Sequence, residues 1–182
     1  MGRAVPPERR QLRPRPTGMM FPEPAPPLKL HGLLAEDLIL SGLRASDRDA
    51  VLEEMAAAAV RRDPSLSRAG LLETLRERER LGSTAIGGGW AIPHGKVAGL
   101  GEPVVVLGVS SRGVDFGAPD GKLCRGFVLA VSAAEAPVQN LRILAATAQL
   151  LRRSKTLLAR IAAAGTPREI LAVIREEEER LP

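Results

Sequence analysis

The residue of this chain best suited to chemistry is His94, which follows Pro93 and precedes Gly95. A histidine titrates near neutrality, so its neutral ring offers a nitrogen that can attack an activated phosphoryl group. A phosphorylated ring carries about two negative charges and needs hydrogen-bond donors around it. Donors of suitable kinds precede His94 within sixteen positions, namely Arg78, Ser83, Thr84 and the glycine-rich run 87–89. The residue types are therefore those of a phosphoryl-accepting histidine.

The same residues also have a purely structural interpretation. A single histidine beside a strand often makes only a structural hydrogen bond, and Gly87-Gly88-Gly89 fits a plain turn. The charged run 76–80 fits a solvated helix face. The glycines complete neither a dinucleotide fingerprint nor a P-loop. Residue types alone leave both interpretations open.

The composition indicates a globular domain with an aliphatic core. Of 182 residues, 45% are hydrophobic and 26% are charged. Three Phe, one Trp and no Tyr leave few aromatic faces for stacking bases or sugars. The net charge is +5, but residues 1–30 alone hold six basic and two acidic side chains. The remaining chain is almost neutral, which argues against nucleic-acid binding by the folded domain.

Residues 1–27 are predicted to be a disordered basic tail, because eight of the 15 prolines lie there among arginines. Residues 28–182 then form one folded domain. The tail lacks the continuous apolar segment of a secretory signal, and no run of about 18 apolar residues predicts a membrane span. The single cysteine, Cys124, cannot form an internal disulfide, which favours a reducing, cytoplasmic setting.

Neither a metal site nor a reactive thiol is expected. Cys124 is predicted to open a strand as a small buried apolar residue. The two histidines, His31 and His94, are 63 positions apart and no Cys/His cluster accompanies them. A structural zinc site is therefore not expected. His31, at the edge of the tail, is expected to be incidental.

Apolar periodicity predicts helices and strands along the folded part. A short strand is expected at 38–40. Two helices follow: one has Ser46 as its N-cap and ends at Asp63-Pro64, and the other begins at Ser67. Two continuous apolar runs, 104–109 and 127–131, predict buried strands separated by a turn at 119–122. The residues of the second helix predicted to face inward are Leu71, Leu72 and Leu75.

Three helical segments end the chain. The first spans 138–151, and its predicted inward face consists of Leu141, Leu144, Ala145, Ala148 and Leu151. The second spans 157–164 and is followed by Gly165. The third begins at Thr166-Pro167-Arg168-Glu169, which has the form of a capping box. This order of elements predicts an α/β (α+β) sandwich, in which a mixed β-sheet is flanked by helices.

The eighteen residues 78–95 read RERLGSTAIGGGWAIPHG. They resemble the signature of the enzyme IIA domains of the fructose/mannitol class, which is close to RE-x-x-x-ST-x-x-G-x-G-x-AIPHG. These domains belong to the phosphoenolpyruvate-dependent phosphotransferase system. Weaker similarity covers roughly residues 30–178, and the run 80–84 is nearest to the nitrogen-regulatory branch. The resemblance implies a mannitol/fructose enzyme IIA-like sandwich.

The resemblance also implies roles for single residues. His94 takes the phosphoryl group from a histidine-containing phosphocarrier protein, and Arg78 helps to hold the phosphate. Ser83 and Thr84 shape the loop and offer hydroxyl donors, and Gly95 belongs to the same pocket. No metal or organic cofactor is implied.

One position departs from the family pattern. Many members place a second histidine beside the first, in an HL-x-x-L pattern at the start of the helix after the last buried strand. Here residues 138–144 read VQNLRIL, so Asn140 takes that place. Asparagine can hydrogen-bond a ring or a phosphate, but it cannot carry a proton or a positive charge. We expect Asn140 to line the pocket and to alter onward transfer. Ala85, in place of a common glycine, is a smaller change.

The predicted function is that of a regulatory phosphoryl carrier of the nitrogen type, with regulated target proteins, no nucleic-acid partner and no membrane insertion. Three alternatives remain. A binding module of the same fold would keep the partner surface without transferring phosphate, which Asn140 favours. A sugar-specific (fructose/mannitol) enzyme IIA would pass phosphate to a IIB domain, which the missing second histidine disfavours. Nucleic acid could also bind through the basic tail.

Overall fold

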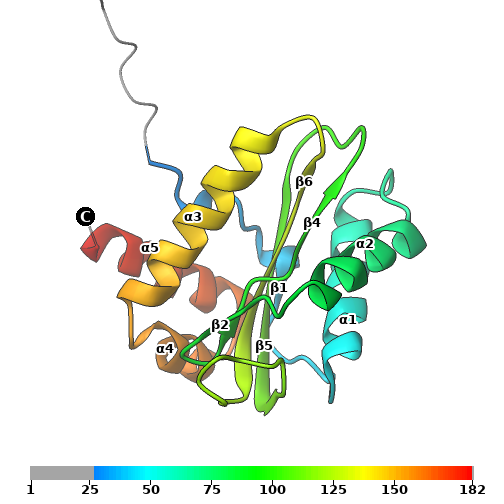
Figure 1. Ribbon diagram of the computed structural model, residues 1–182. Coiled ribbons are helices and arrows are strands. Elements are labelled where there is room, and N and C mark those ends of the chain that lie inside the picture. The colour runs from blue at the N-terminus through cyan, green and yellow to red at the C-terminus, as the bar shows by residue number, and fades with distance from the viewer. Residues whose placement is uncertain (1–26, 182) are drawn as a thin grey trace, which may run out of the picture.

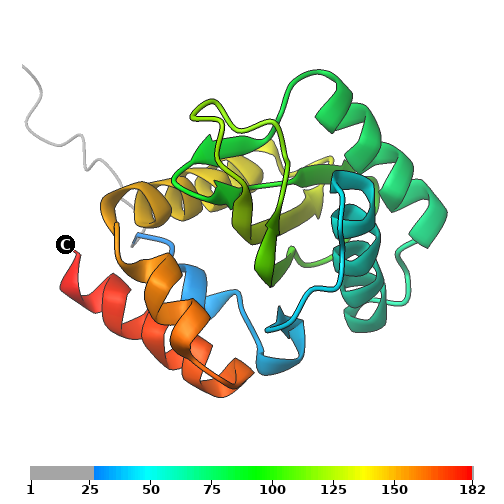
Figure 2. The same ribbon diagram turned by 90° about the horizontal axis from the view of Figure 1, so that it is seen from below.

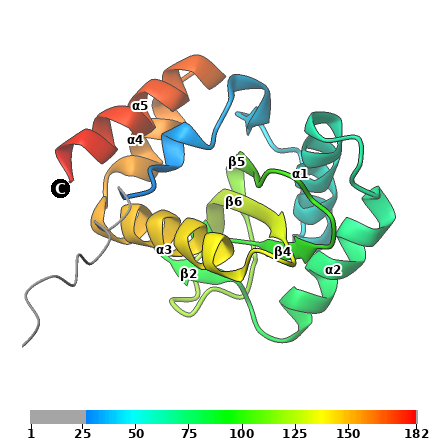
Figure 3. The same cartoon turned by 90° about the horizontal axis from the view of Figure 1, so that it is seen from above.

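The computed structural model describes residues 27–181, which form a β-sheet between two sets of helices (Figure 1). Helices α1 and α2 lie on one side of the sheet, and α3, α4 and α5 lie on the other (Figure 3). The view from below shows the same separation (Figure 2). The predicted sandwich of a mixed sheet flanked by helices is confirmed. The predicted tail, residues 1–27, lies almost wholly outside the described residues and stays a prediction.

The elements follow one another as two turns, one strand, two helices, five strands and three helices. The first part contains η1 (Leu30–Gly32), η2 (Glu36–Leu38), β1 (Ile39–Leu40), α1 (Arg48–Arg62) and α2 (Arg68–Arg80). The strands that follow are β2 (Ala85–Gly87), β3 (Trp90–Ala91), β4 (His94–Val97), β5 (Val104–Val114) and β6 (Cys124–Ala133). The last helices are α3 (Pro137–Arg153), α4 (Leu157–Ala163) and α5 (Pro167–Arg180).

The sheet is built around β5 and β6, which pair antiparallel over most of their length. The strand order is β1-β5-β6-β3-β2, and β4 pairs with β6 outside this path. Strands β3 and β4 both pair parallel with β6, β3 along its first half and β4 along its second half. Because β4 pairs with no other strand of the described chain, it is an edge strand. In that pairing His94 stands opposite Ala130. The first residue of β4 therefore lies at an open edge of the sheet.

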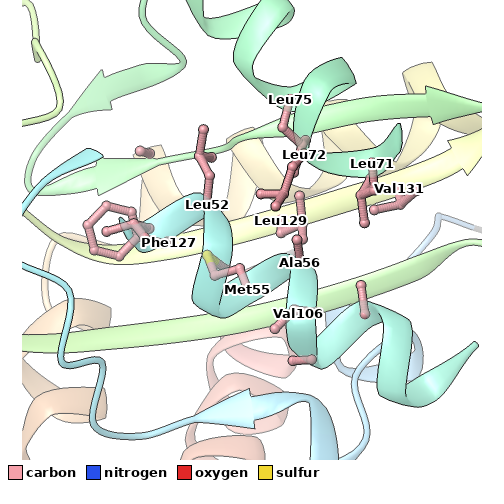
Figure 4. Packing of buried hydrophobic residues seen from close by; sticks show 14 of the residues in the cluster. Leu52, Met55, Ala56, Leu71, Leu72, Leu75, Val106, Phe127, Leu129 and Val131 are labelled. Carbon is pink, nitrogen blue, oxygen red and sulfur yellow. The ribbon is translucent and has the colours of Figure 1, made fainter. Parts of the chain in front are cut away.

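Helices α1 and α2 form the first helical layer, and their inward faces are apolar. Leu71, Leu72 and Leu75 are buried against the sheet, as predicted (Figure 4). Figure 4 also shows Leu52 and Met55 of α1 directed to the same core. This continuous packing against alternate strand residues fixes how far α2 stands from the sheet.

The start of α1 differs from the prediction by one residue. Asp47 is the N-cap, and its Oδ1 accepts a hydrogen bond from the Ala50 N–H at 2.9 Å. Ser46, predicted as the cap, donates from its hydroxyl to Asp47. Serine and aspartate are both common N-cap residues, and the carboxylate of Asp47 also suits the helix dipole. The predicted caps at Ser67 and Thr166 are confirmed, the latter as a full capping box.

The predicted inward face of α3 is correct in part: Leu144 and Ala148 are partly buried against the core and Leu151 is buried, but Leu141 and Ala145 are exposed. The buried residues of this helix are Asn140, Ile143, Thr147, Leu150 and Leu151. Of the predicted set only Leu151 is buried, whereas Leu141 is 67% exposed. The observed stripe is displaced by about one residue, or about 100° around the helix. The helix therefore turns polar side chains toward the sheet and leaves a large apolar residue outside.

Three smaller expectations have clear outcomes. Cys124 is fully buried at the start of β6, and burial raises the pKa of its thiol to about 11. Gly165 follows α4 without a positive φ, and its N–H donates to Glu169. His31 is not incidental, because its Nδ1 lies 2.6 Å from the Glu178 carboxylate of α5 and so ties the two ends of the described chain together.

Candidate active site

The ring of His94 is held at both nitrogens. Its Nδ1 lies 2.8 Å from the carbonyl oxygen of Ile92, and its Nε2 lies 3.0 Å from Nε of Arg78. A carbonyl can only accept a hydrogen bond, so Nδ1 carries the ring proton. The Arg78 Nε–H can only donate, so Nε2 has its lone pair available. The backbone and the arginine thus fix one tautomer, with Nε2 as the nucleophilic atom.

The end of α2 positions Arg78. Its Nη1 donates to the carbonyl oxygen of Gly82 at 2.9 Å, just beyond the helix. The guanidinium therefore lies between the helix end and the His94 ring. Gly82 has a φ of 151°, so the chain turns sharply here, and this turn presents the carbonyl to Arg78.

A buried carboxylate, Glu79, organises the loop that follows. Its oxygens accept from the Thr84 hydroxyl at 2.7 Å and from the Thr84 N–H at 3.1 Å. Arg48 of α1 lies 3.9 Å from the same carboxylate. Glu79 is 6% exposed and Thr84 is 5% exposed, so these bonds are shielded from water. The loop from α2 to β2 is thereby fastened to the helix that carries Arg78.

The hydroxyls of Ser83 and Thr84 are both engaged within this loop. Ser83 donates to the Phe116 carbonyl and accepts from the Ala85 N–H, whereas Thr84 donates to Glu79. In this arrangement both residues shape the loop, and neither hydroxyl donates to His94. Their further expected role as phosphate donors stays a prediction.

Gly95 allows α2 to approach the edge strand. A Cβ at this position would lie 3.1 Å from Cγ2 of Thr74 and 3.3 Å from Cδ2 of Leu75. Larger side chains would push α2 away from β4 and lengthen the distance from Arg78 to His94. We attribute the glycine after the histidine to this close packing.

The glycine-rich run forms the tight hairpin between β2 and β3. Gly87, Gly88 and Gly89 all have positive φ, which glycine adopts without strain. The Gly88 N–H donates to Asp120 at 2.9 Å, and the Gly89 carbonyl accepts from Arg125 and Gly126. The run therefore makes a turn whose backbone groups bind the neighbouring 118–126 segment.

The surroundings of His94 favour its neutral form. Burial lowers the pKa of the ring below its ordinary value of 6.5, and the positive charges of Arg78 and Lys96 lower it further. The Ile92 carbonyl and Glu79 act in the opposite direction. Because the net shift is downward, Nε2 stays unprotonated at neutral pH.

Asn140 lies in the first turns of α3, directly after β6. It is 7% exposed, and among residues 27–181 its Oδ1 has no hydrogen-bond partner. His94 and Asn140 are not joined by a hydrogen bond in the described part of the chain. Its expected place in the pocket therefore stays a prediction.

Two functional groups were missed by the sequence reasoning. Glu79 was visible as the second residue of the RE pair, and that pairing was the signal for its role. The Ile92 carbonyl left no such signal, because a backbone acceptor does not depend on residue type.

Within residues 27–181, no helix is both long and apolar enough to cross a bilayer. The same part of the chain contains no group of three or more His, Cys, Asp or Glu side chains arranged to hold a metal ion.

Comparison with known proteins assigns the family. The model of the family described as "Phosphoenolpyruvate-dependent sugar phosphotransferase system, EIIA 2" matches residues 32–177. A nitrogen regulatory protein of Bradyrhizobium diazoefficiens is 36% identical over 120 residues, which cover 66% of this chain and 78% of that protein. The corresponding Pseudomonas aeruginosa protein is 33% identical over 128 residues, which cover 70% and 82%.

Solved structures agree with this assignment. The nitrogen regulatory protein IIA-Ntr from Neisseria meningitidis aligns with a TM-score of 0.71 and 27% identity, over 79% of this chain and 97% of that one. The match extends from the first turn to α5, and the predicted fructose/mannitol-type resemblance is confirmed. The chain therefore belongs to the type 2 enzyme IIA family of the phosphoenolpyruvate-dependent sugar phosphotransferase system, on its nitrogen-regulatory branch.

Proposed function

We propose that this protein carries a phosphoryl group on Nε2 of His94, received in the cytoplasm from a histidine-containing phosphocarrier protein. Its phosphorylation state would then be read by regulated target proteins. One observation carries the proposal: Nδ1 is bonded to the Ile92 carbonyl, which leaves the Nε2 lone pair facing Arg78. A ring held in this tautomer and kept neutral is prepared to act as a nucleophile.

The transfer itself requires no cofactor. The Nε2 lone pair forms a bond to phosphorus while the N–P bond of the donor histidine breaks, and that electron pair returns to the donor ring. His94 keeps its proton on Nδ1, so its ring becomes a cation. The Ile92 carbonyl, 2.8 Å from Nδ1, stabilises that charge. A protonated ring is also a good leaving group, so the phosphoryl group is readily passed on.

Arg78 has two successive tasks in this scheme. Before transfer its Nε–H donates to the lone pair that must attack, so the guanidinium has to move aside when phosphorus arrives. Afterwards its N–H groups can donate to the phosphoryl oxygens, as arginine does at phosphate sites. The bond from Nη1 to the Gly82 carbonyl keeps the guanidinium close during this change.

The partner's docking surface is proposed to include three outward apolar side chains. Leu81 is 86% exposed directly after the helix of Arg78, and Val138 and Leu141 of α3 are 71% and 67% exposed. Exposed leucine and valine at such positions suit burial in a protein–protein contact.

Phosphorylation by phosphoenolpyruvate, enzyme I and the phosphocarrier protein tests the proposal. Intact mass measured at neutral pH should show one added phosphoryl group on the wild-type protein and none on His94→Ala. His31→Gln is the matched control, because it removes the other histidine, and it should be labelled like wild type. Equal labelling of His94→Ala and wild type would sink the proposal.

A binding module that transfers no phosphate is the second candidate, and the buried amide of Asn140 favours it. A side chain that cannot be protonated replaces the second histidine of transferring relatives. Asn140→His should raise the rate of onward transfer to a IIB acceptor if the native chain is adapted for sensing. Efficient onward transfer by the native chain itself would instead support the sugar-specific alternative.

A further inference from the structure

A hollow of the molecule lies apart from His94, between the β2–β3 hairpin and the junction of α3 with α4. Its volume is about 570 Å³. Neither His94 nor Arg78 lines it. The walls are the glycine hairpin 87–89, the 122–125 segment that leads into β6, and residues 151–158. Figure 1 shows the β2 hairpin beside α4, at the opposite end of the sheet from the start of α3.

Four basic residues line this hollow, which we call the basic pocket: Lys122, Arg125, Arg152 and Lys155. The guanidinium of Arg125 also donates a hydrogen bond to the Ser111 carbonyl, outside the lining. None of its lining residues is acidic. The structure shows no ion pair for any of the four within residues 27–181. Asp120 compensates part of the charge of Lys122, and its carboxylate accepts hydrogen bonds from the Gly88 and Lys122 backbone N–H groups. Like charges around a concave surface concentrate a positive potential there.

The walls of the basic pocket are fixed before any ligand arrives. The Gly89 carbonyl accepts from the N–H groups of Arg125 and Gly126 at 2.8 and 3.0 Å, which joins two walls. A Cβ on Gly89 would lie 2.8 Å from Cδ2 of Leu158, so the hairpin is packed tightly on α4, the third wall. A preformed pocket loses little free energy to ordering when it binds.

Apolar surface is also present among the cations. Leu123 is 50% exposed and Leu158 lines the same hollow, whereas the single tryptophan, Trp90, adjoins it but is only 2% exposed. A volume of this size lies within the range of roughly 300–1,000 Å³ found for small-molecule sites. Lysine and arginine bind phosphate groups, and four of them exceed what one phosphate needs. The pocket thus combines an organic-sized space with charge for several anionic groups.

We propose that the basic pocket binds a small polyphosphorylated metabolite of the nucleoside diphosphate class. The phosphates contact the four basic side chains, and the organic part lies against Leu123 and Leu158. The glycine run, which the sequence suggested as a phosphate-binding loop, then forms one wall of a phosphate site separate from His94. The inference does not depend on phosphoryl transfer by His94.

Isothermal titration calorimetry at physiological salt tests this site with three probes: guanosine diphosphate, pyrophosphate and inorganic phosphate. Guanosine diphosphate should bind with one site per chain and at least about tenfold more tightly than inorganic phosphate. Pyrophosphate, which is transparent where tryptophan absorbs, should also change the fluorescence of Trp90.

Substitutions test whether guanosine diphosphate binds in the basic pocket. Arg152→Gln combined with Lys155→Gln should weaken guanosine diphosphate at least about tenfold. Arg168→Gln, an exposed arginine on α5, should have no effect and serves as the matched control. The proposal fails if the Arg152/Lys155 double variant and Arg168→Gln bind guanosine diphosphate equally well. It also fails if Arg78→Gln abolishes this binding, or if none of the three probes gives a saturable signal. Tighter binding of a single-stranded RNA oligonucleotide than of guanosine diphosphate would also overturn it.

Discussion

The two helical layers of this protein differ in how the polar side chains that they bury are hydrogen-bonded. Helices α1 and α2 pack on the sheet through apolar side chains, with Leu71, Leu72 and Leu75 as the contacts of α2. The one buried charged residue of α2, Glu79, is hydrogen-bonded to Thr84. Helix α3 turns Asn140 and Thr147 inward, and their side-chain oxygens have no hydrogen-bond partner among residues 27–181. Ser132 of β6 has an equally unpartnered buried hydroxyl.

This difference indicates that the layer of α1 and α2 holds the site rigidly, whereas the layer that contains α3 offers a surface for contact with a partner. The first layer must hold Arg78 within 3.0 Å of His94, and close apolar packing gives that precision. The second layer leaves Val138 and Leu141 outside, where a partner can cover them. The two buried polar side chains of α3, Asn140 and Thr147, give up stability that apolar side chains would have provided. The following predictions test this contrast.

The largest expected effect compares two leucines on the two layers. Leu75→Ala should lower the free energy of unfolding by about 2–5 kcal/mol, because Leu75 is 1% exposed and its loss leaves a cavity. Leu141→Ala should change it by less than about 0.5 kcal/mol, since this side chain is mostly in solvent. Urea unfolding followed by circular dichroism measures both. Similar losses for the two variants would mean that α3 faces the sheet as its leucines first suggested.

A second pair compares two buried threonines of the same size. Thr84→Val removes the hydroxyl that donates to Glu79 at 2.7 Å and should lower the free energy of unfolding by about 1–3 kcal/mol. Thr147→Val removes a hydroxyl without a partner among residues 27–181 and should leave stability unchanged or raise it by up to about 2 kcal/mol. Thermal unfolding of both variants supplies the comparison, and a loss at Thr147 equal to that at Thr84 contradicts it.

The sequence predicted the first layer far better than the second. In α2 every apolar residue of the stripe faces the core, so periodicity and capping by Ser67 sufficed. In α3 two apolar stripes lie side by side, and periodicity cannot say which one meets the sheet. The choice depends on how the chain passes from β6 into α3, which is a tertiary fact. In the same way, residue types made His94 and Arg78 candidates and the family resemblance implied their roles, but the Ile92 carbonyl that fixes the tautomer became visible only in the fold.

A third prediction tests whether the exposed face of α3 contacts the phosphocarrier protein. Leu141→Ser should raise the KM for the phosphocarrier protein by about tenfold, or about 1.4 kcal/mol, with little change in kcat. The fold should be unaffected, because the side chain is 67% exposed. Leu123→Ser, which changes an exposed leucine of the basic pocket, is the matched control and should leave KM unchanged. Steady-state phosphorylation assays provide both constants, and equal effects of the two substitutions would remove α3 from the docking surface.

The smallest expected effect concerns the proton on His94. Because burial holds the pKa of this histidine below its ordinary value of 6.5, the neutral ring and the rate of phosphorylation should persist below that pH. The positive charge of Arg78 adds to the lowering, so Arg78→Met should raise the pKa and move the acid limb of the rate profile upward. Lys96→Met should move it in the same direction by less, since Lys96 contributes a weaker repulsion. In both variants the pKa should stay below the ordinary value, because burial is the largest cause and is retained. Titration of the His94 ring by nuclear magnetic resonance measures its pKa in the wild-type protein and in both variants. A lower pKa in Arg78→Met than in the wild type would show that the arginine does not act through its charge.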